Sequence, residues 1–257
     1  MHFARNLLLT VMVFAACLTG TATAQVRVIS SGGFRAPLDA VLPEFQKTSG
    51  ITVTVSSGQS QGDTPNTIAN QLRRGVQADV VIMSREGLDG LIADGRIVKG
   101  TDVNLAQTPL GVSVRAGAPK PDIRTVEAFK KTLLNARAVT FPSSTTGIYM
   151  VAKLFPRLGI ADAVANKTTN VGVAAVAKGD ADIALQPVSE LLHVPGTTFV
   201  GTIPAEIQYI SVFSAAIVGR SQHVEESKRL VAFLMSERVL SALKNSGMDR
   251  FTARSTR

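Results

Sequence analysis

Short apolar runs alternate with segments of helical periodicity along most of the chain. Runs such as VRVIS, ITVTVSS and ADVVIM have the length and β-branched composition of strands. The predicted strands are 26–30, 51–57, 78–83, 110–117, 138–141, 182–186 and 207–218. The predicted helices are 34–49, 66–75, 87–93, 126–135, 146–158, 171–181, 224–235 and 237–245. This alternation predicts an α/β fold with mostly parallel sheets.

The pattern loosens at 101–109 and again at 202–208. If the strands that follow these segments cross between two lobes, the chain leaves the first lobe once and returns once. We therefore expect a ligand cleft between two lobes. The expected organisation is a signal peptide over 1–24, a first lobe over 25–106, a second lobe over 107–206, and a return to the first lobe, with the C-terminal helices, over 207–257.

The first 24 residues have the pattern of a secretory signal peptide. An apolar stretch from Leu7 to Leu18 is followed by the small residues Ala22–Ala24. The stretch is shorter than the roughly 20 residues of a membrane span. The sequence thus predicts export to the periplasm and a mature chain that begins at Gln25. The alternative is acylation of Cys17 as in a lipoprotein, although Phe14 departs from the aliphatic residue of such signals.

The chain is basic, with 27 lysine and arginine residues against 19 acidic ones and a formal net charge of +8. The basic residues are scattered and tryptophan is absent. The chain therefore lacks the clustered aromatic side chains on which proteins that bind single-stranded nucleic acids stack the bases. The one cysteine lies in the predicted signal peptide, and the three histidines are too scattered for a metal site. We expect no nucleic-acid partner, metal or cofactor, and a solvated surface that attracts anions.

Loops rich in serine, threonine and glycine connect strands to helices in SSGGF, SSGQSQGDTP, FPSSTTGIY and TTNVG. The first N–H groups of a helix lack partners inside the helix, and the helix dipole is positive there. One such loop is typical of an ordinary cap, but four predict an anion-binding cleft. Arg35 would pair with a ligand carboxylate or face solvent. The candidate ligand-binding residues are Ser30, Ser31, Gly32, Arg35, Gln59, Ser60, Ser143, Ser144, Thr145, Thr146, Val171 and Gln186.

The export signal and the segments FQKTSGITVTVSSGQS, LRRGVQADVVIMSREGLDGLIADGRIV and VAKGDADIAL resemble the bacterial periplasmic molybdate-binding proteins. These are type II solute-binding proteins of ABC importers. The resemblance covers nearly the whole mature chain and is most specific over 71–98. It implies a two-lobed fold that holds a small oxyanion or carboxylate by hydroxyls and backbone N–H groups, without a counter-cation. It also implies an ABC importer as a partner, and we expect a monomer.

The resemblance fails at the family's ligand positions. The serine of the family's first loop corresponds to Gly33, and the tyrosine that binds the oxyanion corresponds to Pro187. Neither residue offers a hydroxyl, and the second loop is longer than in the family. We therefore expect a small organic polycarboxylate or similar anion as ligand in place of molybdate.

Two functions stay open on these residues. The first is a receptor that delivers the anion to an importer, and the absence of a recognisable catalytic constellation favours it. The second function is that of an enzyme. The segments SSGGF and SELLHVPG resemble those of a divergent subgroup of the family, the periplasmic aconitate isomerases. These enzymes move an allylic proton between cis- and trans-aconitate without a cofactor. That reaction needs a base near the substrate carbon and stabilisation of an enolate. The candidate bases are Glu190, which otherwise caps the SELL turn, His193, Glu206 and Tyr149.

Overall fold

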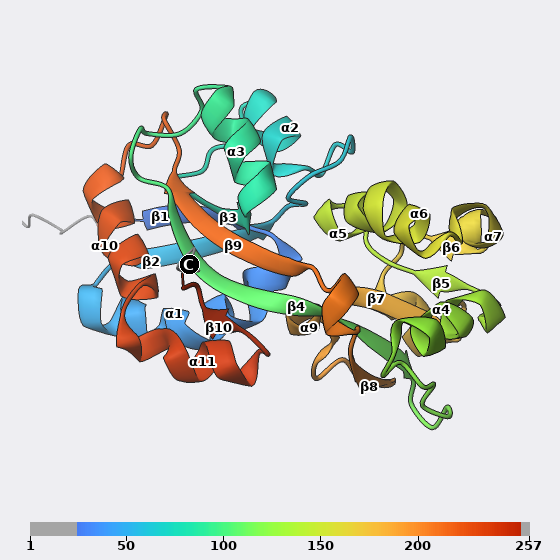
Figure 1. The fold of residues 1–257 in the computed structure, drawn as a ribbon. Coiled ribbons are helices and arrows are strands. Elements are labelled where there is room, and N and C mark those ends of the chain that lie inside the picture. Colours follow the sequence, from blue (N-terminus) through green and yellow to red (C-terminus); the bar gives the residue numbers. More distant parts are fainter. Residues whose placement is uncertain (1–24, 253–257) are drawn as a thin grey trace, which may run out of the picture.

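The structure is a computed structural model that describes residues 25–252. Two lobes lie side by side and share one curled ten-stranded sheet (Figure 1). The strand order is β2-β1-β3-β9-β4-β7-β5-β6, and β8 and β10 also pair with β4. The predicted two-lobed α/β fold is therefore confirmed.

The first lobe is built on parallel strands in the order β2-β1-β3, whose carboxyl ends share one edge. Its strands are β1 (Gln25–Ser30), β2 (Thr52–Ser57), β3 (Val80–Ser84), β9 (Ile210–Ile217) and β10 (Asp249–Arg250). Its helices are α1 (Arg35–Ser49), α2 (Ile68–Arg73), α3 (Arg85–Ala93), α10 (Val224–Leu234) and α11 (Leu240–Asn245). Single 3₁₀ turns cover Gly32–Phe34 and Glu237–Val239.

The second lobe repeats this plan with shorter elements. Its strands are β5 (Val139–Thr140), β6 (Thr168–Thr169), β7 (Ile183–Pro187) and β8 (Thr197–Thr202). Its helices are α4 (Val126–Asn135), α5 (Thr145–Tyr149), α6 (Phe155–Leu158), α7 (Ala161–Ala165), α8 (Val173–Lys178) and α9 (Val188–Leu191). A π-helical turn over Met150–Leu154 joins α5 to α6, and a 3₁₀ turn covers Ala205–Ile207.

One long strand, β4 (Val103–Arg115), belongs to both lobes. Its first half pairs with β9 and β10, and its second half pairs with β7 and β8. The antiparallel pairs of the sheet all include β4 or β9, because the chain crosses to the second lobe in β4 and returns in β9. The predicted parallel pairing holds among the remaining strands. The lobe boundaries at 106 and 206 stay a prediction.

A glutamine side chain fixes the place where the two crossing segments meet. The backbone N–H of Leu110 donates to Oε1 of Gln208 at 2.8 Å, and Nε2 of Gln208 donates to the carbonyl of Leu110 at 3.1 Å. The same Nε2 also donates to the carbonyl of Ile203 at 3.1 Å. The Gln208 amide thus bonds to the backbone of β4 as a neighbouring strand would. These bonds hold β4, which leads to the second lobe, against the segment that returns from it.

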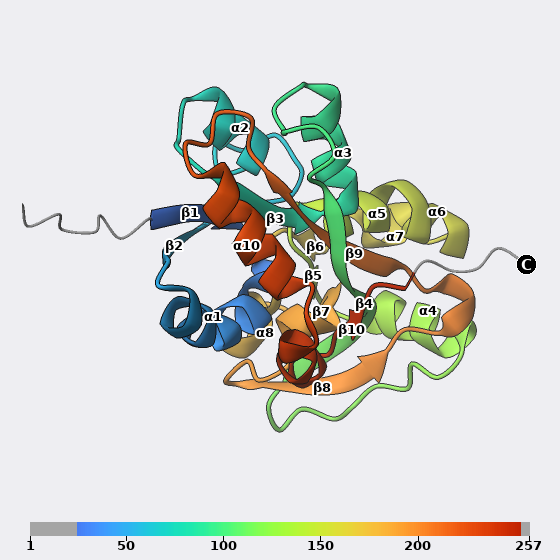
Figure 2. The ribbon, with the colours of Figure 1, turned by 90° about the vertical axis from the view of Figure 1, so that its left-hand side faces the viewer.

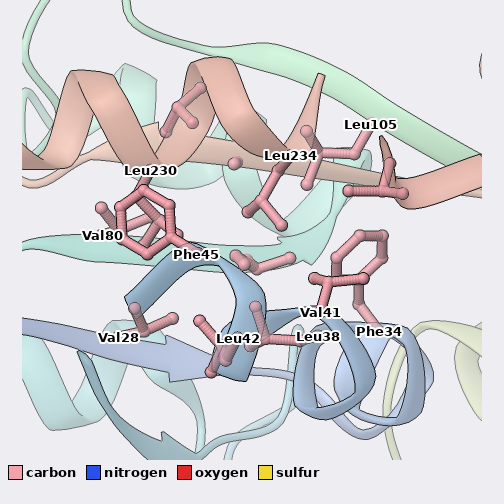
Figure 3. Packing of buried hydrophobic residues seen from close by; sticks show 14 of the residues in the cluster. Val28, Phe34, Leu38, Val41, Leu42, Phe45, Val80, Leu105, Leu230 and Leu234 are labelled. Carbon is pink, nitrogen blue, oxygen red and sulfur yellow. The ribbon is translucent and has the colours of Figure 1, made fainter. Parts of the chain in front are cut away.

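Helix α1 shows why the first lobe folds as the sequence predicts. Its apolar residues recur at helical spacing, and Leu38, Val41, Leu42 and Phe45 are all buried. They pack against the sheet and against α10, as Figure 3 shows. Each fully buried side chain of this size stabilises the fold by about 1.5–3 kcal/mol. Figure 2 views this lobe from its outer end, with α10 in front of the sheet.

The segment 101–109, where the sequence pattern loosens, is largely strand, because β4 begins at Val103. Other predicted elements differ from the structure at their ends. The strand predicted over 207–218 begins at Ile210, because the preceding residues form a 3₁₀ turn. The helix predicted over 171–181 is Val173–Lys178 and ends where Gly179 adopts φ +85°. Strand β8 and the short helix α9 escape prediction, because α9 has only four residues and β8, with the sequence TTFVGT, lacks the alternation of apolar and polar residues that marks a strand.

The predicted signal peptide, including Cys17 and the cleavage site after Ala24, lies outside the described residues. Within residues 25–252, no helix combines the length and the apolar character that crossing a bilayer requires.

A buried carboxylate ties the start of β3 to β1. Asp79 accepts hydrogen bonds from the backbone N–H of Arg27 at 2.8 Å, from Nε of Arg27 at 3.2 Å and from the hydroxyl of Ser221 at 2.9 Å. Burial by itself raises the pKa of Asp79, but these bonds and the charge of Arg27 together hold the pKa below its ordinary value. The carboxylate form therefore stabilises the folded state.

We expect Asp79→Asn to lower the free energy of unfolding by about 1–3 kcal/mol at pH 7, because the buried donors lose a charged partner. A folded-state pKa below the unfolded value gives stability that is present above the unfolded pKa of about 4 and is lost as pH falls through the folded pKa. The difference between parent and variant should therefore shrink below pH 4, which urea denaturation at several pH values measures.

Asp39→Asn is the control, since Asp39 pairs with Arg35 on the surface and such pairs contribute about 0–1 kcal/mol. An Asp79→Asn deficit of equal size at acid and neutral pH would show that the ionised state of Asp79 is not what stabilises the fold.

Candidate functional site

A cavity of about 180 Å³ lies between the lobes, where the carboxyl ends of β1, β2, β3, β5 and β7 face one another. Ligands of open α/β sheets bind at this end of the strands. The cavity is smaller than the roughly 300–1,000 Å³ of pockets for drug-sized molecules, so it suits a small ligand. Its lining residues are Ser31, Gly32, Gly58, Gln59, Ser60, Ser84, Pro142, Ser144, Thr145, Thr146, Pro187, Glu190, Ser211 and Phe213.

Two larger depressions lie elsewhere. One of about 810 Å³ is lined only by residues between Val114 and Ile183, in the second lobe. The other, of about 710 Å³, is lined by residues such as Arg27, Arg96 and Arg220 in the first lobe. Neither lies between the lobes, and each contains an internal ion pair, Arg137 with Asp182 in the first and Arg96 with Asp94 in the second. The smaller interlobe cavity is the better candidate because loops from both lobes converge on it.

The loop after β1 brings a buried hydroxyl to the lining of the cavity. The backbone N–H of Ser31 donates to the carbonyl of Ile82 at 2.8 Å, which fixes the loop against β3. Ser31 is 4% exposed, and among the described residues its Oγ has no hydrogen-bond partner. Because buried hydroxyls normally have a partner, this one is available to a ligand. Ser30 differs, since its Oγ donates to the carbonyl of Ser31 at 3.1 Å.

The glycine that follows makes room for an aromatic ring. A Cβ atom at Gly33 would lie 2.1 Å from Cζ of Phe213, so no side chain fits there while the ring keeps its place. Phe213 lines the cavity together with Pro142 and Pro187. These residues give the cavity an apolar part of its wall.

Hydroxyl groups of the second lobe bridge to the first lobe at the edge of the cavity. The N–H of Gln61 donates to Oγ of Ser144 at 3.1 Å, and the hydroxyls of Ser84 and Thr145 share a hydrogen bond of 2.8 Å. Nε2 of Gln59 also reaches Oγ of Ser143 at 3.4 Å. Ser144 stands at the N-cap of α5, yet its side chain makes no capping bond. These hydroxyls therefore hold the lobes closed.

A tyrosine pair makes a second bridge. The Tyr209 hydroxyl donates to Oε1 of Glu86, and its ring stacks on Tyr149 with centroids 4.5 Å apart. Burial, together with the nearby Glu86 carboxylate, raises the pKa of Tyr209 above its ordinary value, so the hydroxyl keeps its proton. The Tyr149 hydroxyl donates to the carbonyl of Ile207 at 3.3 Å. Tyr149 does not line the cavity. Its contacts with Tyr209 and Ile207 instead help to join the two lobes.

Glu190 is the one ionisable side chain among the described residues that line the cavity. It lies on α9, directly after β7, and is half-buried. Burial raises the pKa of Glu190, and a hydrogen bond from Nε2 of Gln186 offsets this only in part. A carboxyl group with a raised pKa inside a small cavity has the properties of a general acid or base.

The structure brings together eight of the residues singled out in the sequence. Those that line the cavity are Ser31, Gly32, Gln59, Ser60, Ser144, Thr145, Thr146 and Glu190. Ser30, Ser143 and Gln186 lie just behind this lining and bond to it or to its backbone. Within the described residues, no group of three or more histidine, cysteine or acidic residues is arranged to hold a metal ion.

The remaining candidates lie away from the cavity. Arg35 donates from Nε to the Asp39 carboxylate, and Val171 is 63% exposed. His193 lies on the surface with Nε2 at 3.2 Å from the carbonyl of Asn245, and Glu206 is exposed. The TTNVG loop therefore adds no lining residue.

Sequence reasoning missed several lining residues. Ser84 had a detectable signal, because it ends an apolar strand and caps α3 by accepting from the N–H of Gly87 at 3.3 Å. Ser211 and Phe213 had none, since only the return of β9 beside β4 brings them to the cavity. Gly58 also lines the cavity, and Ile68 and Gln71 leave no space for a side chain at its position.

We expect Ser31→Ala to weaken binding of tricarballylate, a saturated tricarboxylate, by about 1.5–3 kcal/mol, because hydrogen bonds to charged groups contribute that much. Folding stability should stay unchanged, since the hydroxyl has no partner among the described residues. Isothermal titration calorimetry and urea denaturation measure the two quantities. Ser227→Ala is the matched control, because Ser227 is equally buried and unpartnered within the described residues but lies on α10. Equal affinities of Ser31→Ala and the parent would remove Ser31 from the site.

The double variant Ser144→Ala, Thr145→Ala should weaken tricarballylate binding by about 1–3 kcal/mol, because it removes two interlobe hydrogen bonds that favour closure. Small-angle X-ray scattering should show a larger radius of gyration for the free variant. As a control, Thr125→Ala removes a true cap on α4, where Thr125 accepts from the N–H of Ala128, and should cost about 1 kcal/mol of stability without changing affinity. If the double variant behaves like the control, these hydroxyls only support their helix.

Comparisons with known proteins agree with this geometry. Residues 26–249 match the family described as bacterial extracellular solute-binding protein. An aconitate isomerase from Pseudomonas sp is 38% identical over 225 residues, which are 86% of each chain.

Two solved structures share the fold at low sequence identity. The periplasmic molybdate-binding protein of Azotobacter vinelandii is 18% identical with a TM-score of 0.67, and the match covers 87% of this chain and 98% of that one. The sulfate-binding protein SubI from Mycobacterium tuberculosis H37Rv is 18% identical with a TM-score of 0.70, covering 88% of this chain and 87% of that one. The match over residues 26–249 and the 38% identical relative decide the assignment: the chain belongs to the bacterial extracellular solute-binding proteins.

Proposed function

We propose that this protein interconverts cis- and trans-aconitate by moving an allylic proton, with Glu190 as the group that carries the proton. The observation behind the proposal is the lone Glu190 carboxyl group in an interlobe cavity whose other described lining residues offer hydroxyl, amide and apolar groups. The 38% identity to a protein named aconitate isomerase supports the same reaction.

The position of Glu190 favours chemistry over simple binding. A carboxylate repels an anionic ligand, and no lysine, arginine or histidine stands among the described lining residues to compensate it. A receptor selected only to hold a polycarboxylate would gain affinity by losing this group. An enzyme needs it, because a base must lie within reach of the carbon that gives up its proton.

The reaction balances without an oxidant or a cofactor. In the proposed mechanism, Glu190 takes a proton from the methylene carbon of aconitate, and the C–H electron pair spreads over the three-carbon unit and its carboxylates. The protonated Glu190 then returns the proton to the former vinyl carbon, and the double bond shifts by one position. Hydroxyl donors such as Ser31 would stabilise the negative charge that develops. The apolar wall with Phe213 would exclude water from the reactive carbons.

A receptor that delivers a polycarboxylate to an ABC importer is the second candidate. Membership in a family of solute-binding proteins and the hydrogen bonds that close the lobes favour it. Export to the periplasm suits both functions. The two differ in one measurable respect, since a receptor returns its ligand unchanged.

We expect the purified protein to convert trans-aconitate into the cis isomer, and cis into trans, as followed by proton NMR. Glu190→Gln should lower kcat by about 100-fold or more, the size of a general acid–base contribution. It should bind tricarballylate at least as tightly as the parent, because it removes a repulsive charge. Catalysis should decline as pH falls through the raised pKa of Glu190, since the reaction starts from the carboxylate.

His193→Ala is the control and should keep full activity, because His193 lies on the surface beside Asn245. A parent protein that is stabilised by aconitate in a thermal-shift assay but never isomerises it would support the receptor. Stabilisation by molybdate or tungstate alone would contradict both polycarboxylate functions. A ligand at 100 times its Kd adds about 2.7 kcal/mol of stability, which the assay detects.

A further inference from the structure

The Gln186 side chain accepts one hydrogen bond and donates another. It is 5% exposed at the end of β7. Its Oε1 accepts from the backbone N–H of Val173, and its Nε2 donates to Oε2 of Glu190. A backbone N–H is only a donor, so the amide oxygen must face Val173 and the amide nitrogen must face Glu190. The orientation of the amide is thereby determined.

The surroundings hold the amide in this orientation. Gly172, which precedes the first residue of α8, has φ +79°, and a Cβ atom there would lie 3.0 Å from Oε1 of Gln186. The N–H of Gly172 donates to Oγ1 of Thr140 on β5 at 2.9 Å. The start of α8 is thus attached to β5 and β7 together, and Gln186 has no free rotation toward the cavity.

The contact leaves one carboxyl oxygen of Glu190 for the cavity. Oε2 is occupied by the amide of Gln186. Oε1 lies on the side of Gly32, a lining residue, at 3.6 Å from where a Cβ atom of Gly32 would be. Because glycine has no side chain, the space in front of Oε1 stays open.

Ionisable groups near Glu190 are few. The elements packed most closely against α9 are β4, β7 and the 3₁₀ turn Gly32–Phe34. They contain one ionisable residue, Arg115, at the far end of β4. His193 follows α9 but lies near the carbonyl of Asn245. The polar neighbour that governs the charge of Glu190 is therefore Gln186.

We propose that Gln186, which the sequence suggested as a ligand-binding residue, is instead a positioning residue for proton transfer. Its amide holds Oε2 of Glu190 and presents Oε1 to the substrate. A hydrogen bond donated to a carboxylate also favours the charged form, so Gln186 counteracts burial and favours the ionised Glu190 that acts as the base. This inference rests on the proposed isomerase function.

The variant Gln186→Glu separates the two hydrogen bonds. A glutamate carboxylate still accepts from the N–H of Val173 but has no proton to donate to Glu190. The new carboxylate at position 186 repels the carboxylate of Glu190, and this repulsion raises the pKa of one of the two groups. We expect the acid limb of the pH profile of kcat to move up by about one unit or more, and kcat at pH 7 to fall about tenfold, with KM changing less than about threefold. Gln186→Leu, which removes both bonds, should shift the limb in the same direction and also lower stability.

Gln46→Glu is the matched control. Oε1 of Gln46 likewise accepts from a backbone N–H, that of Val53 at 2.8 Å, but Gln46 lies on α1 in the first lobe. This variant should keep the pH profile of the parent.

Carbon-13 NMR of glutamate-labelled protein supplies a readout that needs no activity. The Glu190 carboxyl resonance is assigned by its loss in Glu190→Gln and then titrated. A higher pKa of Glu190 in Gln186→Glu, with a matching shift of the activity profile, supports the proposal. An unchanged titration and profile with lower stability would overturn it and leave Gln186 as a structural partner of α8. A shifted titration in a protein that never isomerises aconitate would overturn the proposed function and, with it, the catalytic role of the contact.

Discussion

The whole molecule depends on one strand that two lobes share. Because β4 carries β9 and β10 on its first half and β7 and β8 on its second, neither lobe can turn freely against the other. The side chain of Gln208 strengthens this constraint by bonding to Leu110 from the returning segment. The parallel strands of both lobes consequently end at a common cavity. Their loops supply hydroxyl groups from two directions, so a binding site arises from topology before any particular ligand is considered.

Within that site, burial and charge oppose each other at Glu190. The cavity offers hydroxyl groups that suit an anion, while the buried carboxyl group suits the neutral state. When an anionic ligand enters, its negative charge repels the ionised form of Glu190 and favours the protonated form. Ligand binding and protonation of Glu190 are therefore coupled. A carboxyl group whose proton affinity rises when substrate enters is well suited to take a proton from that substrate. The amide of Gln186 limits this rise from the opposite side.

Local patterns in the sequence predict local structure well and the site only in part. Helix α1 and strands β1–β3 follow from periodicity, and SSGGF and FPSSTTGIY line the cavity as their hydroxyl content suggested. The TTNVG loop does not, because Gln186 already occupies the N–H of Val173 and Val171 faces solvent. Phe213 and Ser211 reach the cavity only through strand pairing between distant segments, which no local pattern encodes.

Gly33 and Pro187, the two positions where we expect the sequence to depart from molybdate-binding proteins, also have a structural role. At Gly33, the missing side chain leaves the space that the Phe213 ring fills, so an apolar ring lies where a side chain would otherwise be. At Pro187, the ring restricts φ, which is −50°, and the chain turns directly from β7 into the helix that carries Glu190. A tetrahedral oxyanion needs donors on every side. A planar acid with a reactive carbon needs donors at its carboxylates and a dry face where a base meets the carbon. In the proposed reaction, both departures serve that second requirement.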